Sequence, residues 1–545
     1  MRVTNFSAAC CGAVNFTTAE KLKYNDKCME RFKKFITDKK LLLVVFITGA
    51  AVLVIEVSAT RILASYFGNT LYSFSSIIST VLGALSLGYY YGGRMADKNP
   101  SRRNFYLIIL YSGISVLLLY VFSLFLLPIL GFLLSPMFGP LIASLALFFI
   151  PSLLLGMLSP FAIKLQSEHA PSGTIGTISG EVFFWSTLGS IGGSLVSGFF
   201  LIPSFGVDVI MVGLALTLVV VGLGGVGING ISKKTAQNIG FLVISALIIA
   251  FMWRQGIHDK FLVVSDGIYE KLYVYDGTYE GKPTRFFTQD TTASGAMNLL
   301  DGGLAYEYTK YYDTHRVFNS DIKRALVIGG GIYSVPKQLL VDIPDIQVDV
   351  AEIEPSLYDL AKKYFGLKDD PRLSNYVVDG RRFLHDSTNA YDFIFTDAYK
   401  SLYSMPVHLT TKEFFETASK KLSPGGVFMA NIIGSLSSAS PSFTLSEMRT
   451  FRNVFPNSYF FATKSPKSTE PQNLIFIGLK SDQIPNFSSP EVLHDNNPLV
   501  RSLGEKLIDV STFDFSQYTM FTDNYAPVEY YGARFLADVA RNKEK

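Results

Sequence analysis

The stretch that decides the fold of the soluble half is residues 324–354, which read RALVIGGGIYSVPKQLLVDIPDIQVDVAEIE. Residues 325–328 form an apolar run with the length and β-branched content of a buried strand. This run leads directly into Gly329, Gly330 and Gly331. A ligand can approach the backbone closely at such a glycine turn.

A helix and a second strand are expected after the glycines. Ser334 is predicted to cap this helix, with Pro336 in its first turn. Residues 347–353 alternate as a strand does and carry Glu352, which lies 21 residues after Gly331. In a doubly wound sheet, glycines and an acid at about this spacing hold the adenosine part and the ribose hydroxyls of a ligand. The alternative is a tight turn between core strands with no ligand.

Composition separates the chain into a membrane half and a soluble half. With 545 residues the chain is too long for a single hydrophobic core. Of these residues 49% are hydrophobic, and the mean hydropathy is +0.29. The apolar excess lies before about residue 256, which is typical of a membrane module. The predicted segments are a basic tail (1–40), a transmembrane helical domain (41–256), a small β subdomain (258–320) and an α/β domain (321–545).

The membrane half is predicted to be an all-α bundle of about seven helices. Apolar runs of membrane length lie near residues 41–60, 73–92, 105–130, 139–161, 182–203, 207–227 and 237–253. Glycines such as Gly189 and Gly193 allow close helix packing. Lys and Arg follow the second, fourth and sixth runs, so the amino terminus is expected in the cytoplasm and the soluble half outside it.

Two charges in the first apolar run require partners. Glu56 and Arg61 stand five residues apart, too far round a helix to face each other directly, so each is expected to pair with a partner on another helix, or Arg61 to snorkel to the membrane surface. A substrate path is the alternative. All three cysteines lie in the tail, which makes a disulfide framework unlikely and favours free thiols.

The soluble half continues with strands that end on acids. Residues 258–320 are predicted to form a set of β-hairpins and then a helix that carries Tyr308. Further strands are predicted at 376–378, 393–396, 427–433, 459–462 and 474–479, giving a mostly parallel sheet of about seven strands. Glu352, Asp379 and Asp397 each close a strand, and we expect them to converge on one pocket at the carboxyl edge.

Several motifs resemble a known family. VIGGG, AEIE, VVDGRRFL, YDFIFTDAY, TKEFF and LSPGGV occur in this order between residues 325 and 427. They resemble the polyamine aminopropyltransferases, the spermidine synthase family. The helices before them and the ending TDNYAPVEYY are similar to its membrane-fused branch. The resemblance implies a class I methyltransferase-like (Rossmann-like) fold for the α/β domain, with the small β subdomain before it.

The resemblance also implies roles for individual residues. Gly329, Gly330 and Gly331 would line the site of decarboxylated S-adenosylmethionine, and Glu352 would hold its ribose. Asp379 with Gly380 would meet the adenine. Asp397 would accept a proton from the attacking amine, and Tyr308 lies near the position of a tyrosine that lines the amine channel.

Two positions depart from the family pattern. Ile332 stands where the family has an acid after its glycines, and Lys400 stands where it has a second acid after the catalytic one. Both family acids face the cationic amine. Each lost charge-assisted hydrogen bond would weaken polyamine binding by about 1 to 3 kcal/mol.

The sequence therefore predicts a membrane-anchored aminopropyltransferase that uses decarboxylated S-adenosylmethionine. A methyltransferase using S-adenosylmethionine itself, and a membrane sensor or transporter that binds an adenosyl ligand, are the alternatives. The expected partners are a small-molecule amine, the lipid bilayer and, as one option, a second copy of the chain. A net charge of +3 does not favour nucleic acid, and no histidine has zinc-ligand spacing. The side of the membrane on which the α/β domain lies stays open. The loop charges place it outside, whereas S-adenosyl cofactors are made in the cytoplasm.

Overall fold

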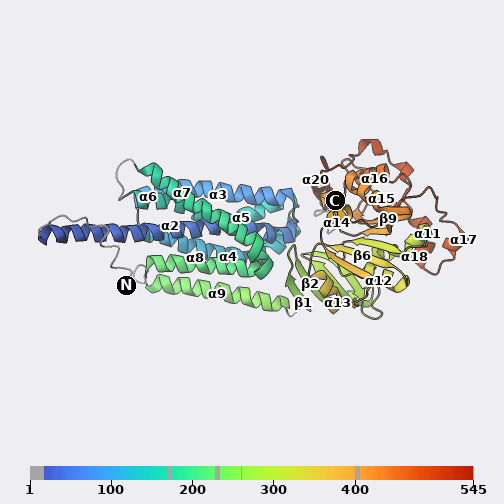
Figure 1. Cartoon of the computed structure of the whole chain (residues 1–545), viewed down its shortest axis with the longest axis horizontal. Coiled ribbons are helices and arrows are strands. Elements are labelled where there is room, and N and C mark those ends of the chain that lie inside the picture. The colour runs from blue at the N-terminus through green and yellow to red at the C-terminus, as the bar shows by residue number, and fades with distance from the viewer. Residues whose placement is uncertain (1–17, 169–173, 228–232, 259, 399–405, 544–545) are drawn as a thin grey trace. The chain divides into compact units, whose positions relative to one another are not determined.

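The computed structural model describes residues 18–168, 174–227, 233–258, 260–398 and 406–543 (Figure 1). The chain forms two compact units. The first comprises Met1–Ala59, Ile77–Leu124 and Ser144–Leu247, and the second comprises Thr60–Ser76, Phe125–Ala143 and Ile248–Lys545. Two short pieces of the apolar half therefore belong to the unit that contains the sheets. Lys400 and the tail cysteines Cys10 and Cys11 lie outside the described residues.

The amino-terminal half is helical, as predicted. Its helices are α2 (Thr18–Phe67), α3 (Leu71–Lys98), α4 (Arg102–Leu133), α5 (Gly139–Gly156), α6 (Leu158–Ser167), α7 (Ile175–Val196), the π-helical η1 (Ser197–Leu201), α8 (Ile202–Val226) and α9 (Lys233–His258). Among the described residues, five helical stretches are long and apolar enough to cross a membrane: Lys39–Phe67, Leu71–Lys98, Arg102–Leu133, Gly139–Ser167 and Ile175–Val226.

The predicted count of seven spans is approximate. Two predicted spans fall in the single stretch Ile175–Val226, within which Gly206 has non-helical angles, φ 69° and ψ 161°. The last predicted span corresponds to the shorter apolar helix Gln237–Trp253. The break at Gly206 lies between the two predicted spans, 182–203 and 207–227.

Small residues bring α2 and α7 into close contact, as their number in the sequence suggested. A Cβ atom at Gly189 would lie 2.0 Å from the carbonyl oxygen of Phe46, and one at Gly193 would lie 2.5 Å from that of Ala50. Any larger residue would push the two backbones apart. This is the packing expected between helices in lipid.

The predicted hairpins form a four-stranded antiparallel sheet in the order β1-β2-β3-β4. Its strands are β1 (Val263–Asp266), β2 (Lys271–Tyr279), β3 (Lys282–Gln289) and β4 (Thr292–Asn298). The tyrosine-rich segment that follows forms α10 (Glu307–Lys310) and the 3-10 helix η3 (Tyr311–Thr314), and then α11 (His315–Phe318).

The main sheet has seven strands in the order β10-β11-β9-β8-β5-β6-β7. Its strands are β5 (Arg324–Ile328), β6 (Gln347–Glu352), β7 (Leu373–Val377), β8 (Tyr391–Thr396), β9 (Leu422–Gly434), β10 (Ser458–Ala462) and β11 (Gln472–Leu479). Neighbouring strands from β9 to β7 pair in parallel, and β11 pairs antiparallel with both β9 and β10. The predicted α/β fold class is confirmed.

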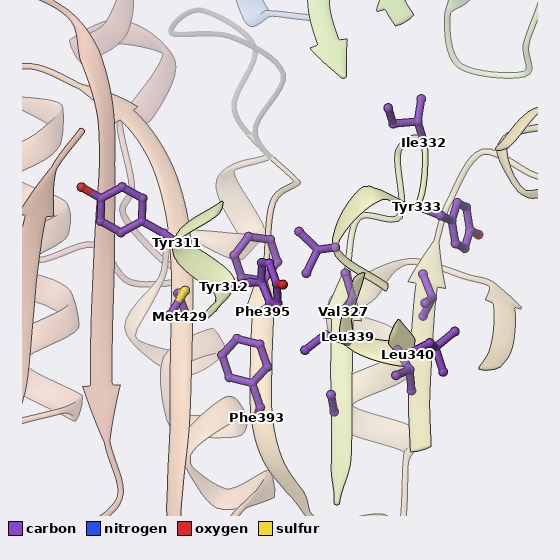
Figure 2. Packing of buried hydrophobic residues seen from close by; sticks show 14 of the residues in the cluster. Tyr311, Tyr312, Val327, Ile332, Tyr333, Leu339, Leu340, Phe393, Phe395 and Met429 are labelled. Carbon is purple, nitrogen blue, oxygen red and sulfur yellow. The ribbon is translucent and has the colours of Figure 1, made fainter. Parts of the chain in front are cut away.

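Two apolar layers cover the two faces of this sheet. Val327 and Phe395 contribute to one cluster, with Leu339 of α12 (Ser334–Asp342), and Leu360 of α13 (Leu357–Tyr364) belongs to it. Figure 2 shows Val327, Phe393, Phe395 and Met429 among Tyr311, Tyr312 and Leu339. The alternate side chains Leu326 and Ile328 face the second cluster. Burial on both faces explains the unbroken apolar run at residues 325–328.

The helices of the carboxyl-terminal part contribute to both layers: Val492, Val500 and Leu503 belong to the first cluster, and the other helices pack in the second. They are α14 (Gly380–Asp386), the 3-10 helix η4 (Val407–Leu409), α15 (Lys412–Lys421), α16 (Phe443–Val454), α17 (Pro490–Leu493), α18 (Pro498–Arg501), α19 (Leu503–Lys506), the 3-10 helices η5 (Val510–Thr512) and η6 (Phe515–Gln517), and α20 (Val528–Lys543). Phe414 and Phe451 are among their fully buried side chains.

Two local predictions were wrong. Ser334 does not cap α12; the N-cap position belongs to Tyr333, which has a left-handed φ of 59° and gives no side-chain cap. The backbone N–H of Tyr333 donates to the Gly330 carbonyl, so the glycine turn closes one residue before Ser334. Arg61 was expected to find a partner on another helix, but its guanidinium donates to the carbonyl oxygens of Gly267 and Ile268 between β1 and β2.

Candidate active site

The glycine turn lies where β5 ends, at the point where the chain order of the parallel strands reverses. Gly329 and Gly331 have φ values of +87° and +53°, which side chains rarely adopt. A Cβ atom at Gly329 would also lie 2.8 Å from the carbonyl oxygen of Asp397. The turn therefore requires glycine, and it brings the ends of β5 and β8 together.

Glu352 at the end of β6 holds this turn. Its Oε2 accepts hydrogen bonds from the backbone N–H groups of Gly330 at 2.8 Å and Gly331 at 3.1 Å, and its Oε1 accepts one from Glu354 at 2.8 Å. Burial raises the pKa of Glu352, and these backbone donors oppose the rise. The carboxylate thus fixes the shape of the loop that a ligand would meet.

Asp379 caps α14 and faces a histidine that the sequence did not single out. Its Oδ1 accepts a hydrogen bond from the backbone N–H of Arg382 at 2.9 Å, and its Oδ2 lies 2.9 Å from His408 Nε2. The His408 hydrogen bond holds the pKa of Asp379 below its usual value. Gly380 follows directly, and a Cβ atom there would meet Ile328 Cγ2 at 2.2 Å. The close packing of α14 on β5 thus explains this glycine.

Asp397, at the end of β8, is held by two polar side chains. Asn431 Nδ2 donates to its Oδ1 at 2.8 Å, and the Tyr308 hydroxyl also hydrogen-bonds to it. Asn431 in turn accepts a 2.9 Å hydrogen bond from Asn473 Nδ2. Burial raises the pKa of Asp397 to about 6, although both donors to the carboxylate lower it. A carboxylate with this pKa is ionised at neutral pH and is a stronger base than an ordinary aspartate.

These groups share one cavity of about 600 Å³. The glycine turn lines it, as do the three acids predicted to converge, Glu352, Asp379 and Asp397. Tyr308, Gly380, His408 and Asn431 line it as well. The convergence of the three strand ends is therefore a feature of the structure, and the volume lies within the range of small-molecule sites.

The wall beyond Asp397 is aromatic. Tyr306 stacks on Tyr308 with ring centroids 6.0 Å apart, and Tyr279 meets Tyr306 edge-on at 5.4 Å. Ile332 also lines the cavity but is only 4% exposed, because it packs against Gly295, where a Cβ atom would lie 2.8 Å from it. The position after the glycines thus presents an apolar surface to the site.

Three polar residues of the site were missed by the sequence reasoning: His408, Asn431 and Asn473. The sequence does contain an indication of Asn431. It is the one polar residue in FMANII, and this segment belongs to β9, the strand beside the one that Asp397 ends. His408 and Asn473 have no such indication, because nothing in their local pattern separates them from loop or strand-edge residues.

The described residues include no group of three or more His, Cys, Asp or Glu side chains that could hold a metal ion. Features that fit an adenosyl ligand are present instead. The glycine turn leaves its backbone accessible, with open space around the Cβ position of Gly331. Both carboxylate oxygens of Glu352, however, already accept hydrogen bonds from backbone N–H groups in and near the turn.

Comparison with known proteins gives consistent similarities. Residues 313–488 match the family model of the spermine/spermidine synthase domain. Over 164 residues, 30% of this chain, it is 31% identical to a polyamine aminopropyltransferase of Vibrio vulnificus, covering 53% of that protein. Over 177 residues, 32% of this chain, it is 30% identical to a probable polyamine aminopropyl transferase of Bifidobacterium longum, covering 38% of it. The chain thus spans about half, or less, of these relatives.

One solved structure, a probable spermidine synthase from Corynebacterium glutamicum, is 23% identical to the chain. The match covers 48% of this chain and 97% of that one, with a TM-score of 0.41.

Proposed function

We propose that the chain is an aminopropyltransferase, because its residues 313–488 match the family model of the spermine/spermidine synthase domain. In this proposal it moves an aminopropyl group from decarboxylated S-adenosylmethionine to a putrescine-like amine. Asp397 is the base. The observation that carries the proposal is the position of this carboxylate, which shares a cavity with the glycine turn and is held by Asn431 and Tyr308.

The chemistry requires a base and little else from the protein. The amine nitrogen forms a bond to the carbon beside the sulfonium, and the carbon–sulfur bond breaks with its electron pair going to sulfur. A neutral thioether leaves. The proton that the nitrogen sheds passes to Asp397 and from there to water. Since the sulfonium is already a good leaving group, positioning and the ionised carboxylate provide most of the acceleration.

The adenosyl end of the ligand is assigned to the part of the cavity that the glycine turn, Glu352 and Asp379 line. Gly329, Gly330 and Gly331 would lie against it, and Asp379 with Gly380 would meet the adenine. Glu352 would bind the ribose, and its hold on the glycine turn supports a second role in shaping that site. Tyr308 would contact the amine as well as Asp397, and Ile332 would form an apolar wall.

A second candidate is methyl transfer from S-adenosylmethionine to an unknown acceptor. Two features favour it. Ile332 supplies no negative charge for a dicationic polyamine, and Lys464 brings a positive charge to the lining of the cavity. Lys464 could pair with the carboxylate that S-adenosylmethionine has and its decarboxylated form lacks.

The test uses the purified full-length chain with each co-substrate. Decarboxylated S-adenosylmethionine with putrescine or spermidine is expected to give an aminopropyl product, and Asp397→Asn is expected to lose nearly all of this turnover while adenosyl binding persists. Methyl transfer from S-adenosylmethionine, with no aminopropyl product, would establish the second candidate. Adenosyl binding with neither product would instead indicate a sensor or transporter.

We further propose that the chain is a multi-pass membrane protein, which the five long apolar helices support. Loop charges favour the outer side for the catalytic domain, and co-substrate supply favours the cytoplasm. A reporter that is active on only one side, fused after Lys545, distinguishes the two. The helical region can also be tested by extraction, since a spanning protein requires detergent and a peripheral one leaves the membrane in alkali or salt.

A further inference from the structure

The last turns of α2 belong to the same compact unit as the cavity. Arg61 lies there, and its guanidinium donates two hydrogen bonds, from Nη1 to the Ile268 carbonyl at 2.7 Å and from Nη2 to the Gly267 carbonyl at 2.8 Å. The planar fork of an arginine suits two adjacent acceptors in a way that a lysine cannot match. Arg61 therefore fixes the turn between β1 and β2 at two points.

This turn packs against a buried acid. The backbone N–H of Tyr269 donates to Glu354 Oε2 at 3.2 Å, and a Cβ atom at Gly267 would lie 2.7 Å from the same oxygen. Glu354 is 3% exposed, and its Oε1 accepts a 2.7 Å hydrogen bond from the Ser356 hydroxyl. Any movement of the turn would therefore displace the Glu354 carboxylate.

Glu354 is linked directly to the residue that holds the glycine turn. Its backbone N–H donates to Glu352 Oε1 at 2.8 Å, and Glu352 Oε2 accepts from Gly330 and Gly331. Hydrogen bonds, joined by short covalent stretches of the chain, thus connect Arg61 through the β1–β2 turn to the loop that would meet an adenosyl ligand.

The carboxyl-terminal end of α2 contacts the rest of this unit at two further places. The Ser65 hydroxyl donates to Asp290 Oδ1 at 2.9 Å, and Asn69, two residues after α2 ends, lines the cavity together with Tyr269. The charges of Asp266, Asp290 and Glu354 also act on the guanidinium of Arg61. The helix end is therefore built into the wall of the site.

We propose that Arg61 is a positioning residue for the adenosyl co-substrate, acting through Glu354 and Glu352 on the glycine turn. The inference rests on the proposed function, because it presupposes that the cavity binds an adenosyl compound. It gives the apolar helical half a role in the reaction beyond anchoring.

The experiment measures co-substrate binding and steady-state kinetics of the full-length chain in detergent. Arg61→Met is expected to raise the Kd and KM for decarboxylated S-adenosylmethionine about tenfold, a typical coupling between linked sites, with kcat changed by less than about twofold. Arg61→Lys should restore part of the affinity, since an ammonium can serve one of the two carbonyls. Arg94→Met, at an exposed arginine of α3, is the matched control and should change neither constant.

A second variant perturbs the middle of the path. Gly267→Ala places a methyl group against Glu354 and should weaken co-substrate binding in the same way, even if Arg61→Met does not fold. Wild-type affinity in both Arg61→Met and Gly267→Ala would overturn this inference and leave the proposed function intact. Failure of the wild-type chain to bind decarboxylated S-adenosylmethionine would overturn the proposed function and this inference with it.

Discussion

The hydrogen bond from Asn431 to Asp397 provides a direct test of the proposed base. Asn431→Leu removes the donor at nearly constant volume, so water cannot easily replace it. The donor lowers the pKa of Asp397, which is about 6 in the intact site, so its loss should raise that pKa. A hydrogen bond to a charged group contributes about 1.5 to 3 kcal/mol, which corresponds to a rise of about one to two pH units.

The sign of the activity change follows from the role of the group. Asp397 must be ionised to accept a proton, so activity is lost as the pH falls through its pKa. Near pH 7 a carboxylate with a pKa of about 6 is about nine-tenths ionised, and one raised by about 1.5 pH units is about one-quarter ionised. The kcat/KM of Asn431→Leu near pH 7 should therefore fall about fourfold and recover near pH 9.

The assay is the pH profile of kcat/KM for aminopropyl transfer, measured in one buffer series at constant ionic strength. Asn473→Leu is the control, because Asn473 donates to Asn431 and has no hydrogen bond to Asp397. Its acid limb should shift much less. An acid limb that stays in place in Asn431→Leu, or a loss that is equal at every pH, would refute the assignment of Asp397 as the titrating base.

Three further outcomes follow from the same geometry. Asp397→Asn should reduce kcat by about 10² to 10⁴-fold, the usual share of a general base, with unchanged adenosyl affinity by calorimetry; normal turnover would remove Asp397 from the mechanism. Glu352→Gln should raise the Kd for the adenosyl co-substrate about tenfold, because its amide nitrogen must then face either the Gly330 and Gly331 donors or the Glu354 donor and can accept from neither; unchanged affinity would show that the turn holds its shape without them. Gly380→Ala should lower the free energy of unfolding by about 1 to 3 kcal/mol in denaturant titrations, whereas Gly504→Ala, with ordinary contacts, should change it by less than about 0.5 kcal/mol.

Strong periodic signals predicted most of the soluble fold. The run at residues 325–328 is buried on both faces, and its termination by three glycines fixes the end of β5. Acids that directly follow apolar runs must lie at the carboxyl edge of a parallel sheet, so Glu352, Asp379 and Asp397 could be placed together from the sequence alone. The start of β7 was predicted three residues late, because residues 373–375 are only partly apolar.

Tertiary contacts decided the features that the sequence did not predict. Tyr333, a bulky residue in a left-handed conformation, took the N-cap position because the glycine turn closes on it. The partners of Arg61 are backbone carbonyls more than 200 residues away, and no pattern of side chains marks a carbonyl. The contact between His408 and Asp379 likewise depends on how η4 packs beside α14.

The surroundings of Asp397 reconcile two opposing requirements. A strong base needs a raised pKa, which burial provides, but a base that is protonated at neutral pH cannot act. Asn431 and Tyr308 oppose the effect of burial with hydrogen bonds that favour the ionised form. In the proposed reaction a bound sulfonium would favour it further, and that charge disappears as the carbon–sulfur bond breaks. Asp397 would then become more basic at the stage when the amine gives up its proton. A neutral asparagine suits this better than a cation, since a lysine in its place would hold the carboxylate ionised after transfer and weaken it as a proton acceptor.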